Sequence, residues 1–432
     1  MAVCGHKEPE LLIAFLAAVK AGHPYVPIDD ALPPQRIARI VAAAGCRATL
    51  TPETIAAAAN RAEAAPERPH TSSTPYYIMF TSGSTGDPKG VIITRRCLSS
   101  FLAWLLAEQR FAEGETFLNQ VSYSFDVSVM DTYAALLTGG TVFSITRDDI
   151  NDPKRLYRTL RASEVTTWVS TPSFAGMCLA ERGFAASMLP RVRRFLFCGE
   201  ALPPAVAGQL LERFPDAEVW NTYGPTETTV ATSSVRVDRN MLTRYAALPI
   251  GRAMPGTRLV VVDERGAPVA AGDRGEIVIA GPNVSPGYIG RAELTARSFH
   301  ELDGAPAYRT GDWGHYEDGL LFCDGRMDDQ IKLHGYRVEL GDVEANLRSV
   351  PGVRDVVVLP IVKNDRPESL AAFVVLSERP PGSDFEVSRA LRTRLAERLP
   401  AYMLPRRFFF LENLPMTPNG KADRRQLAAR LT

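Results

Sequence analysis

Apolar residues in the first part of the chain recur at helical spacing and then at strand spacing. Residues 9–20 carry an apolar face typical of a helix, and "AGHPYVPIDD" ends that helix and begins a strand. The same spacing predicts a helix over 34–45 that stops at Gly45. Residues 54–70 are rich in alanine and end in prolines, which indicates a surface helix that runs into a linker. The apolar run "YYIMF" (76–80) predicts a short strand.

In the middle of the chain, apolar strands alternate with helical stretches. The segments 166–172, 193–199 and 218–224 read as strands, and each ends in a polar or glycine-bearing turn. Such alternation is typical of an α/β sheet whose functional site lies at the carboxyl ends of its strands. We therefore expect functional side chains in the turns that follow these strands.

The apolar segments become shorter and more closely spaced in the last third of the chain. Between about 249 and 325, "RLVVVD", "GEIVIAG" and "LLFCDG" are separated by turn residues, which predicts a small β-rich subdomain. A compact module follows, with strands near "VRDVVVLP" and "LAAFVVL" and a helix over 387–398. The predicted fold class is α/β, with a large domain of α/β sheets and a β-rich subdomain over 1–326 and a small α+β domain over 327–432.

Composition narrows the class of protein. Lysine plus arginine and aspartate plus glutamate both total 49 of 432 residues, so no charge excess points to nucleic acid as a partner. The six cysteines include no CxxC pair, which argues against a zinc cage and fits the reducing cytoplasm. No apolar run is long enough to insert in a membrane. The run 11–19 follows two glutamates, Glu8 and Glu10, so a buried helix is favoured over a signal peptide.

The stretch "TSGSTGDPKG" (81–90) follows the predicted strand 76–80 and resembles a grip for phosphate. Glycines turn backbone N–H groups toward an anion, and hydroxyls and a lysine add donors. It is not a Walker A loop, because Pro88 stands where the second glycine belongs and Gly90 follows Lys89. It also lacks the G-x-S-x-G spacing of a hydrolase. Taken alone, a flexible surface turn remains the alternative.

The remaining motifs resemble the adenylate-forming superfamily, which includes acyl-CoA synthetases, luciferases and the adenylation domains of peptide synthetases. With the phosphate loop, they follow in the family's order along nearly the whole chain: "VKAGHPYVPID" (19–29), "FDVS" (125–128), "NTYGPTE" (221–227), "GEIVIAGPNVSPGYIG" (275–290), "YRTGD" (308–312), "GRMDDQIKLHGYRVELGDVE" (325–344), "LPAYMLP" (399–405) and "NGKADR" (419–424). One such match is weak, but the ordered series is highly specific.

The resemblance implies ATP and Mg²⁺ as cofactors. Lys421, Glu227 and Thr226 would be catalytic, with Lys421 bridging the substrate carboxylate and the α-phosphate and Glu227 holding the metal. Asp328 would be the hinge about which the small domain swings. Without its flanking motif, Lys421 would read as a solvated charge. The residues implied to bind ATP are Thr81, Ser82, Gly83, Ser84, Thr85, Lys89, Asn221, Thr222, Tyr223, Gly224, Pro225, Thr226, Asp312, Cys323, Asp324, Gly325, Arg326 and Lys421.

Asp126 indicates what kind of acid is activated. In family members that activate amino acids, an aspartate here pairs with the substrate ammonium, and a buried carboxylate needs such a partner. A helix-capping aspartate is the alternative. The resemblance places Asp126, Met130, Cys198, Val230 and Lys421 at the substrate. Around the substrate side chain it adds Val127, Ser170, Leu196, Thr222 and Ala231, which are mostly apolar and leave room for a small amino acid.

The sequences of several segments are most similar to those of family members that activate D-alanine. Those members load D-alanine onto the phosphopantetheine of a small acyl or peptidyl carrier protein, as in D-alanylation of lipoteichoic acid. In these members the cysteine of "FLFCGE" lies beside the side-chain pocket, so Cys198 is expected to bias the site toward the D-enantiomer. The chain is N-terminally short relative to the family pattern. The alternatives are a freestanding peptide-synthetase adenylation enzyme for another small amino acid and an inactive adenylate-binding protein.

Overall fold

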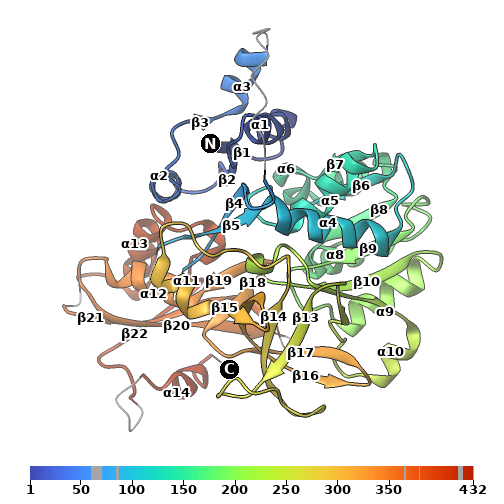
Figure 1. The fold of residues 1–432 in the computed structure, drawn as a ribbon. Helices are drawn as coiled ribbons and strands as arrows, with labels where there is room; N and C mark the ends of the chain where they lie inside the picture. The colour runs from blue at the N-terminus through green and yellow to red at the C-terminus, as the bar shows by residue number, and fades with distance from the viewer. Residues whose placement is uncertain are drawn as a thin grey trace. The chain divides into compact units, whose positions relative to one another are not determined.

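The computed structural model describes residues 1–59, 71–83, 87–333, 335–363, 366–378, 380–416 and 422–431. The chain forms two compact units (Figure 1). The first comprises Met1–Asp29, Ala44–Phe80 and Gly90–Met327, and the second comprises Asp30–Ala43, Thr81–Lys89 and Asp328–Thr432. Two segments from the predicted large domain thus belong to the second unit, and the division at residue 326 stays a prediction.

A seven-stranded sheet forms the centre of the first unit, in the order β12-β11-β10-β9-β8-β6-β7. The strands from β6 to β10 pair in parallel, and β11 and β12 are antiparallel additions at one edge. The predicted strands over 166–172, 193–199 and 218–224 are confirmed as β8, β9 and β10. The bounds are β6 Thr116–Asn119, β7 Thr141–Ser144, β8 Thr167–Ser170, β9 Arg194–Phe197, β10 Glu218–Tyr223, β11 Ser233–Val237 and β12 Arg252–Ala253.

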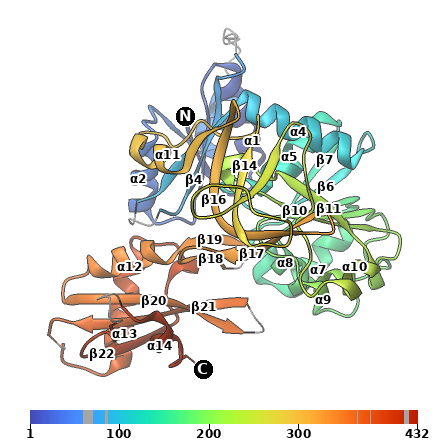
Figure 2. The same cartoon turned by 60° about the horizontal axis from the view of Figure 1, so that its bottom comes forward.

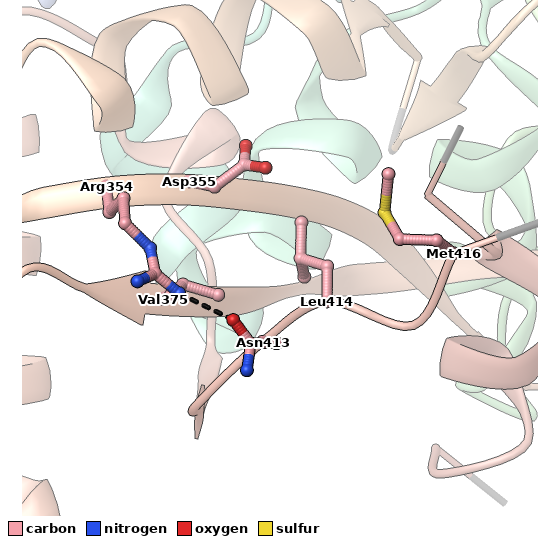
Figure 3. A pocket seen from close by; sticks show the side chains of 6 residues that line it. All are labelled: Arg354, Asp355, Val375, Asn413, Leu414 and Met416. Atoms are coloured by element: carbon pink, nitrogen blue, oxygen red, sulfur yellow. Dashed lines mark hydrogen bonds between the residues drawn. The ribbon is translucent and has the colours of Figure 1, made fainter. Parts of the chain in front are cut away.

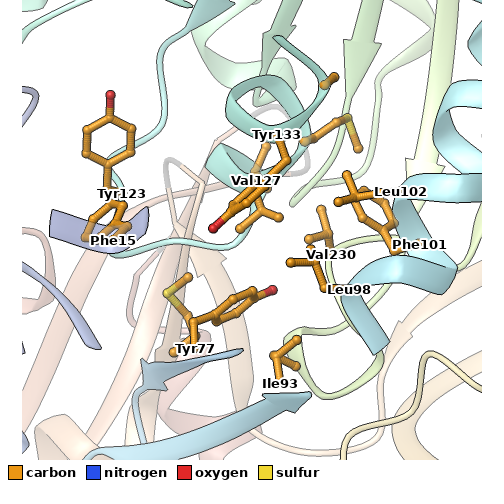
Figure 4. Close-up of a cluster of buried hydrophobic side chains, with 14 of the residues drawn as sticks. Phe15, Tyr77, Ile93, Leu98, Phe101, Leu102, Tyr123, Val127, Tyr133 and Val230 are labelled. Atoms are coloured by element: carbon orange, nitrogen blue, oxygen red, sulfur yellow. The ribbon is translucent and has the colours of Figure 1, made fainter. Parts of the chain in front are cut away.

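Helices cover both faces of this sheet, because its strands are apolar on both sides. Along β6, Phe117 packs in one core with residues of α4 and α5, whereas Leu118 packs in a second core with residues of α7, α8 and α9. Figure 4 shows part of the first core. The helices are α4 Arg95–Gln109, α5 Val127–Leu137, α6 Arg147–Asn151, α7 Pro153–Ala162, α8 Pro172–Leu179, α9 Pro204–Arg213 and α10 Arg239–Arg244.

The N-terminal residues add a three-stranded parallel sheet in the order β2-β1-β3 and a two-stranded sheet of β4 and β5. The helix predicted over 9–20 is confirmed as α1 (Pro9–Lys20), and α3 (Pro52–Ala59) covers the start of the helix predicted over 54–70. The rest of that predicted helix lies outside the described residues. The strands are β1 Ala2–Gly5, β2 Val26–Asp29, β3 Thr49–Leu50, β4 Pro75–Thr81 and β5 Lys89–Thr94.

The predicted β-rich subdomain is a five-stranded antiparallel sheet in which β17 extends β13-β14-β16-β15. Its longest strand, β16, was not predicted. Two register shifts lie on this strand, one beside Glu276 of β14 and one between Trp313 and Gly314. The bounds are β13 Arg258–Val262, β14 Gly275–Ala280, α11 Ala292–Ser298, β15 Phe299–Leu302, β16 Ala305–Glu317 and β17 Leu320–Arg326.

The second unit is built on a three-stranded sheet of β20, β21 and β22 with helices around it (Figure 2). Helix α2 belongs to this unit, where Arg36 donates to the buried Asp342 at 3.2 Å. Its elements are α2 Pro34–Ala43, β18 Gln330–Leu333, β19 Tyr336–Glu339, α12 Leu340–Arg348, β20 Val353–Lys363, β21 Arg366–Leu376, α13 Asp384–Ala396, η2 Ala401–Met403, β22 Arg407–Leu411 and α14 Arg424–Ala428. Across the described ranges of both units, every helix is too short or too polar to span a lipid bilayer.

Candidate functional site

The carboxyl end of β10 leads into a turn that holds many of the predicted site residues. Asn221 and Thr222 are buried, and their side chains donate to Pro249 O and Phe197 O, each at 2.8 Å. Beyond the strand, a Cβ on Gly224 would lie 2.7 Å from Ala231 Cα, so the turn requires glycine. Pro225 then leads into the 3₁₀ helix η1 (Thr226–Thr228). The sequence thus places this motif where an α/β sheet presents its functional turns.

Tyr223, Asp312 and Arg326 form one hydrogen-bonded cluster in the first unit. The Tyr223 hydroxyl donates to Asp312 Oδ2 at 2.5 Å, and Arg326 Nη1 donates to Asp312 Oδ1 at 3.0 Å. Burial, followed by the Asp312 charge, raises the pKa of Tyr223 well above its usual range, so the hydroxyl stays protonated as a donor. Two residues predicted from separate motifs, Tyr223 and Arg326, therefore converge on the carboxylate of a third, Asp312.

The part of β16 that carries Asp312 is held by a residue for which the sequence predicted no role. Glu276 is buried; its Oε1 accepts from Gly311 N at 3.0 Å and its Oε2 accepts from Arg309 Nε at 2.8 Å. Gly311 has a φ of 68°, and a Cβ there would lie 2.9 Å from Arg326 Nη2. The motif "GEIVIAG" contains Glu276, but nothing in its spacing signals the contact with the β16 residues before Asp312.

The remaining predicted residues of β17 lie beside β16. Arg326 pairs with Asp312 across the sheet, and Gly325 pairs with Trp313. The Asp324 carboxylate contacts His315 Nδ1 at 2.8 Å. Cys323 is partly buried in the same subdomain core as Tyr223. These positions place the segment 323–326 along the strand that carries Asp312.

Glu227 lies in η1 and is fully buried. Its Oε1 accepts from the Tyr288 hydroxyl at 2.8 Å, and its backbone oxygen accepts from Ser285 N at 2.9 Å. Thr226 precedes it and is also buried. Across the described ranges, no group of three or more His, Cys, Asp or Glu side chains is arranged to hold a metal ion. Any cation here would rely on Glu227 with ligands from elsewhere.

Asp126 stands at the N-cap of α5 with φ −66° and ψ −21°. Within the described residues, its side chain makes no capping hydrogen bond to the helix, which counts against the helix-capping alternative. Burial, followed by the charges of Tyr25 and Asp126, raises the pKa of Tyr77 well above its usual range. Asp126 therefore lies close enough to Tyr77 to interact with it electrostatically. The side chain is only partly buried.

The predicted side-chain pocket maps to the core between the sheet and α5. Cys198 and Val230 are 1% exposed and Met130 is fully buried, and Cys198 Sγ contacts Val230 O at 3.5 Å. Figure 4 shows Val127 and Val230 in this core. Ser170 is oriented by two neighbours, since its hydroxyl accepts from Trp168 Nε1 and donates to Thr171 O. One apolar cluster contains Val127, Met130, Leu196, Cys198, Val230 and Ala231.

In the second unit, the first residues of the phosphate loop contact β19. The Ser82 hydroxyl donates to Arg337 O at 2.8 Å and accepts from Glu339 N at 3.3 Å. A Cβ on Gly83 would lie 2.3 Å from Asp87 O. Thr81 ends β4, Lys89 begins β5, and Asp328 Oδ1 accepts from Gln330 N at 3.2 Å. Ser84, Thr85 and Lys421 lie outside the described residues.

A pocket of about 340 Å³ lies in the second unit (Figure 3). Arg354 and Asn413 on its wall hydrogen-bond to each other at 2.8 Å. The pocket contains none of the predicted site residues. The lining residues are Arg354, Asp355, Val375, Asn413, Leu414 and Met416.

Two family models match the chain. The model described as AMP-binding enzyme matches residues 1–289, and the model described as AMP-binding enzyme C-terminal domain matches residues 342–421. Together these matches extend over most of the chain and include Lys421.

Among curated proteins, the chain is similar to D-alanine--D-alanyl carrier protein ligases of Bacillus. It is 45% identical over 448 residues to the ligase of one Bacillus cereus strain, a match that covers 100% of this chain and 89% of the relative. It is 46% identical over 453 residues to the ligase of Bacillus thuringiensis (strain Al Hakam), with the same coverage.

Among solved structures, the chain is similar to PA1221, an NRPS protein containing adenylation and PCP domains, with a TM-score of 0.83, 30% identity and coverage of 100% of this chain and 75% of that one. It shares its fold with the Vibrio cholerae adenylation domain AlmE, solved with glycyl-adenosine-5'-phosphate, at a TM-score of 0.85, 22% identity and coverage of 99% and 89%. The predicted fold class is confirmed by these likenesses, with a large N-terminal and a smaller C-terminal domain.

Proposed function

Because the chain belongs to the AMP-binding enzyme family, we propose that it activates D-alanine with ATP and transfers the D-alanyl group to the phosphopantetheine thiol of a carrier protein. The observation that carries the proposal is the meeting of Tyr223 and Arg326 at the Asp312 carboxylate, which joins β10 to β16 and β17 in the first unit. The names of its Bacillus relatives supply D-alanine and the carrier protein.

In the first step, a carboxylate oxygen of D-alanine attacks the α-phosphorus of ATP. The bond from that phosphorus to the pyrophosphate oxygen breaks, and D-alanyl-adenylate forms. In the second step, a thiolate attacks the acyl carbon and AMP leaves with the electron pair of the C–O bond. The first step brings two anions together, so it requires cationic groups around the phosphates.

Asp312 is suited to hold the ribose of ATP. A carboxylate offers about four lone-pair positions, and here one hydrogen bond comes from Tyr223 and one from Arg326. The remaining positions can accept from the two ribose hydroxyls without breaking either contact. Arg326 also donates to Thr310 O at 2.6 Å, which fixes the position of its guanidinium group. Both oxygens of the Asp312 carboxylate are therefore hydrogen-bonded before ATP binds.

Glu227 fits a Mg²⁺ ion. Mg²⁺ takes oxygen ligands and in nucleotide enzymes needs only one or two carboxylates, with phosphates and waters completing its shell. Glu227 supplies such a carboxylate, oriented by Tyr288. When bound, the ion would reduce the charge repulsion between ATP and the incoming carboxylate. The phosphate-loop residues Thr81, Ser82, Gly83, Ser84, Thr85 and Lys89 would contact the outer phosphates.

Asp126 supplies the counter-charge for the substrate ammonium. Its carboxylate is partly buried at the start of α5, where pairing with a cation offsets the cost of its desolvation. We place the side-chain pocket within the apolar cluster that contains Val127, Met130 and Cys198, whose apolar side chains suit a methyl group. A fatty acid or acetate would leave Asp126 without that partner.

Replacing Cys198 with alanine is expected to reduce the preference for D-alanine over L-alanine by about tenfold. The thiol is 1% exposed and contacts Val230 O, so its removal opens space at the pocket wall. The preference is measured as the ratio of kcat/KM for pyrophosphate exchange with each enantiomer. Cys178→Ala, at an equally buried thiol in the second core, is the control. An unchanged ratio in Cys198→Ala would exclude the thiol from enantiomer selection.

Replacing Tyr223 with phenylalanine is expected to raise the KM for ATP by about tenfold, because it removes one hydrogen bond to a charged carboxylate. The KM for D-alanine is expected to change much less. Tyr316→Phe is the matched control, since Tyr316 lies on β16, the strand that carries Asp312, and its hydroxyl donates to Leu259 O at 2.9 Å. Equal effects of the two variants on ATP would show that the Asp312 contact is not used in nucleotide binding.

The transfer step needs a thiol from a separate molecule, for which a small carrier protein with phosphopantetheine is the proposed source. ATP as co-substrate places the reaction in the cytoplasm, and the carrier would deliver D-alanine toward lipoteichoic acid. Asp328 is proposed as the hinge between the two steps, since a hinge absorbs backbone rotation without touching substrate.

Amino-acid-dependent pyrophosphate exchange tests the proposal, with D-alanine, L-alanine, glycine and D-serine assayed in parallel. The expected result is the highest kcat/KM with D-alanine, followed by transfer to a phosphopantetheinylated carrier protein. A clear preference for another amino acid would instead identify a peptide-synthetase type of adenylation enzyme. Nucleotide binding without exchange for any amino acid would overturn the enzymatic assignment.

A further inference from the structure

Two consecutive residues at the proposed side-chain pocket adopt a backbone conformation that their side chains disfavour. Thr229 and Val230 have φ values of 62° and 67°. Both are β-branched, and such residues rarely occupy the left-handed region because the branched side chain crowds the backbone. Conformations of this kind persist only where the surroundings enforce them, and they concentrate at functional sites. Both residues are buried, so solvent does not relieve the crowding.

The side chain of Asn283 spans this turn. Its Nδ2 donates to Thr228 O at 2.8 Å and to Thr232 Oγ1 at 3.1 Å, which lie on either side of the strained pair. Its Oδ1 accepts from Thr257 Oγ1 at 2.8 Å. The side chain thus uses both amide hydrogens and its oxygen, and it is fully buried.

The backbone of Asn283 also contacts the strained pair directly. Its carbonyl oxygen accepts from Thr229 Oγ1 at 2.8 Å. Within the turn, Ala231 N donates to Thr229 O at 2.8 Å, which closes a tight bend. The Thr228 and Thr232 hydroxyls contact each other at 2.9 Å across the base of the turn. The turn is therefore held at its base and at its first strained residue by one asparagine.

The strained turn forms part of the wall of the proposed side-chain pocket. Val230 packs in the cluster that contains Val127, Met130 and Cys198 (Figure 4), and its carbonyl oxygen contacts Cys198 Sγ at 3.5 Å. Rotation of Val230 out of its positive φ would move both its side chain and that carbonyl. The size of the pocket consequently depends on what holds residues 229 and 230.

We propose that Asn283 is a positioning residue that fixes the Thr229–Val230 turn and thereby sets the size of the amino-acid side chain that the pocket accepts. This inference rests on the proposed function, because it takes Val230 as part of the pocket wall. Asn283 acts through the turn and need not contact the substrate. Loss of its side chain would leave Thr228 O, Thr232 Oγ1 and Thr257 Oγ1 with one partner fewer each, and the turn could relax toward a negative φ.

The test compares Asn283→Ala and the isosteric Asn283→Asp with the unmodified protein. Relaxation of the pocket wall is expected to lower the kcat/KM ratio of D-alanine to D-2-aminobutyrate by about tenfold, which is the scale of discrimination by one methylene. The KM for ATP should change by less than about threefold, since the nucleotide cluster at Asp312 is not altered. Should Asn283→Ala prove insoluble, Asn283→Asp gives the same reading, because it removes both amide donors at constant volume.

Asn346→Ala is the matched control. Asn346 is also buried, and its Nδ2 donates to Asp342 O and Oδ1, each at 2.9 Å, within the second unit. It should lower stability without changing the substrate ratio. An Asn283 variant that loses stability to the same degree, with its substrate ratio unchanged, would overturn the proposal.

Thr229→Gly supplies an independent measurement, because glycine adopts a positive φ without crowding. In that background, part of the strain is gone, so Asn283→Ala should change the substrate ratio less than it does alone. Additive effects of the two substitutions would contradict the proposal. Absence of amino-acid-dependent exchange in the unmodified protein would instead refute the proposed function, so the two failures are distinguishable.

Discussion

Replacing Lys421 with alanine is expected to slow adenylate formation by about two to three powers of ten, the scale seen when one transition-state donor is removed. In the family pattern this lysine bridges the substrate carboxylate and the α-phosphate. Its charge is needed most when negative charge accumulates between those two groups. The rate of D-alanine-dependent pyrophosphate exchange measures the effect.

The second half-reaction separates this role from a general loss of structure. Thiol transfer from preformed D-alanyl-adenylate has no pentavalent phosphorus to stabilise, so Lys421→Ala should leave its rate nearly unchanged. Lys363→Ala, at an exposed lysine that ends β20, should leave both rates unchanged. Equal slowing of both half-reactions in Lys421→Ala would exclude the proposed role, as would unchanged exchange.

The sequence predicted three adjacent strands of the central sheet, because their signal is local, and did not predict β6, β7, β11 and β12. The strands β8, β9 and β10 are short apolar runs that end in polar turns, and that pattern needs no knowledge of distant contacts. β16 was missed because "YRTGDWGHYE" contains glycines and charges that suppress the strand signal. Its strand geometry comes from pairing on both sides with β14 and β17.

The candidate site likewise contains residues that the sequence predicted and residues that depend on contacts between distant segments. Asp312 and Tyr223 were found because their motifs are specific, yet the hydrogen bond between them joins residues 89 positions apart. Asn283 and Glu276 lie in a matched motif that predicts no role for either, since their partners become neighbours only in the folded chain. The positive φ of Thr229 and Val230 was also beyond reach, because β-branched residues carry no local preference for that conformation.

A buried ionisable cluster was likewise invisible in the sequence. Lys7 donates to Asn119 Oδ1 and to Val121 O, and its ammonium lies 4.9 Å from the ring centre of Tyr123. Asn119 Nδ2 in turn donates to Asp131 Oδ1 at 2.8 Å. Among the described residues, Asp131 Oδ2 has no hydrogen-bond partner. Asp131 lies on α5, the helix that begins after Asp126, so the cluster supports the helix that presents the proposed ammonium ligand.

Burial shifts both charged members of this cluster toward their neutral forms. It lowers the pKa of Lys7 to about 7, although Asp131 and Asp29 oppose the shift. It raises the pKa of Asp131 to about 7, although Lys7, Thr132 and Asn119 oppose that shift. The charge of each group therefore stabilises the charged form of the other. Removal of either group leaves its partner buried without a nearby opposite charge.

Replacing Lys7 with methionine is expected to lower the free energy of unfolding by about 3–5 kcal/mol near neutral pH, the range for breaking a buried charge pair. Methionine keeps most of the side-chain volume, so the loss reports the ammonium group with its hydrogen bonds and not a cavity. The double variant Lys7→Met/Asp131→Asn removes both charges and should recover most of the loss. Urea denaturation of the full chain measures all three proteins. A double variant as unstable as the sum of the single variants would show that the two groups are not coupled.

The two single variants should depend on pH in opposite directions. In Lys7→Met, the pKa of Asp131 in the folded state rises above its value in the intact pair, so stability is highest in acid and is lost as pH rises through that pKa. In Asp131→Asn, the pKa of Lys7 falls further, so stability is highest in base and is lost as pH falls through that pKa. Denaturation at about pH 5.5 and about pH 8.5, referred to the double variant, measures both slopes. If the free energy of unfolding changed with pH in the same direction in both single variants, burial of Lys7 and Asp131 would not control the ionisation of either group.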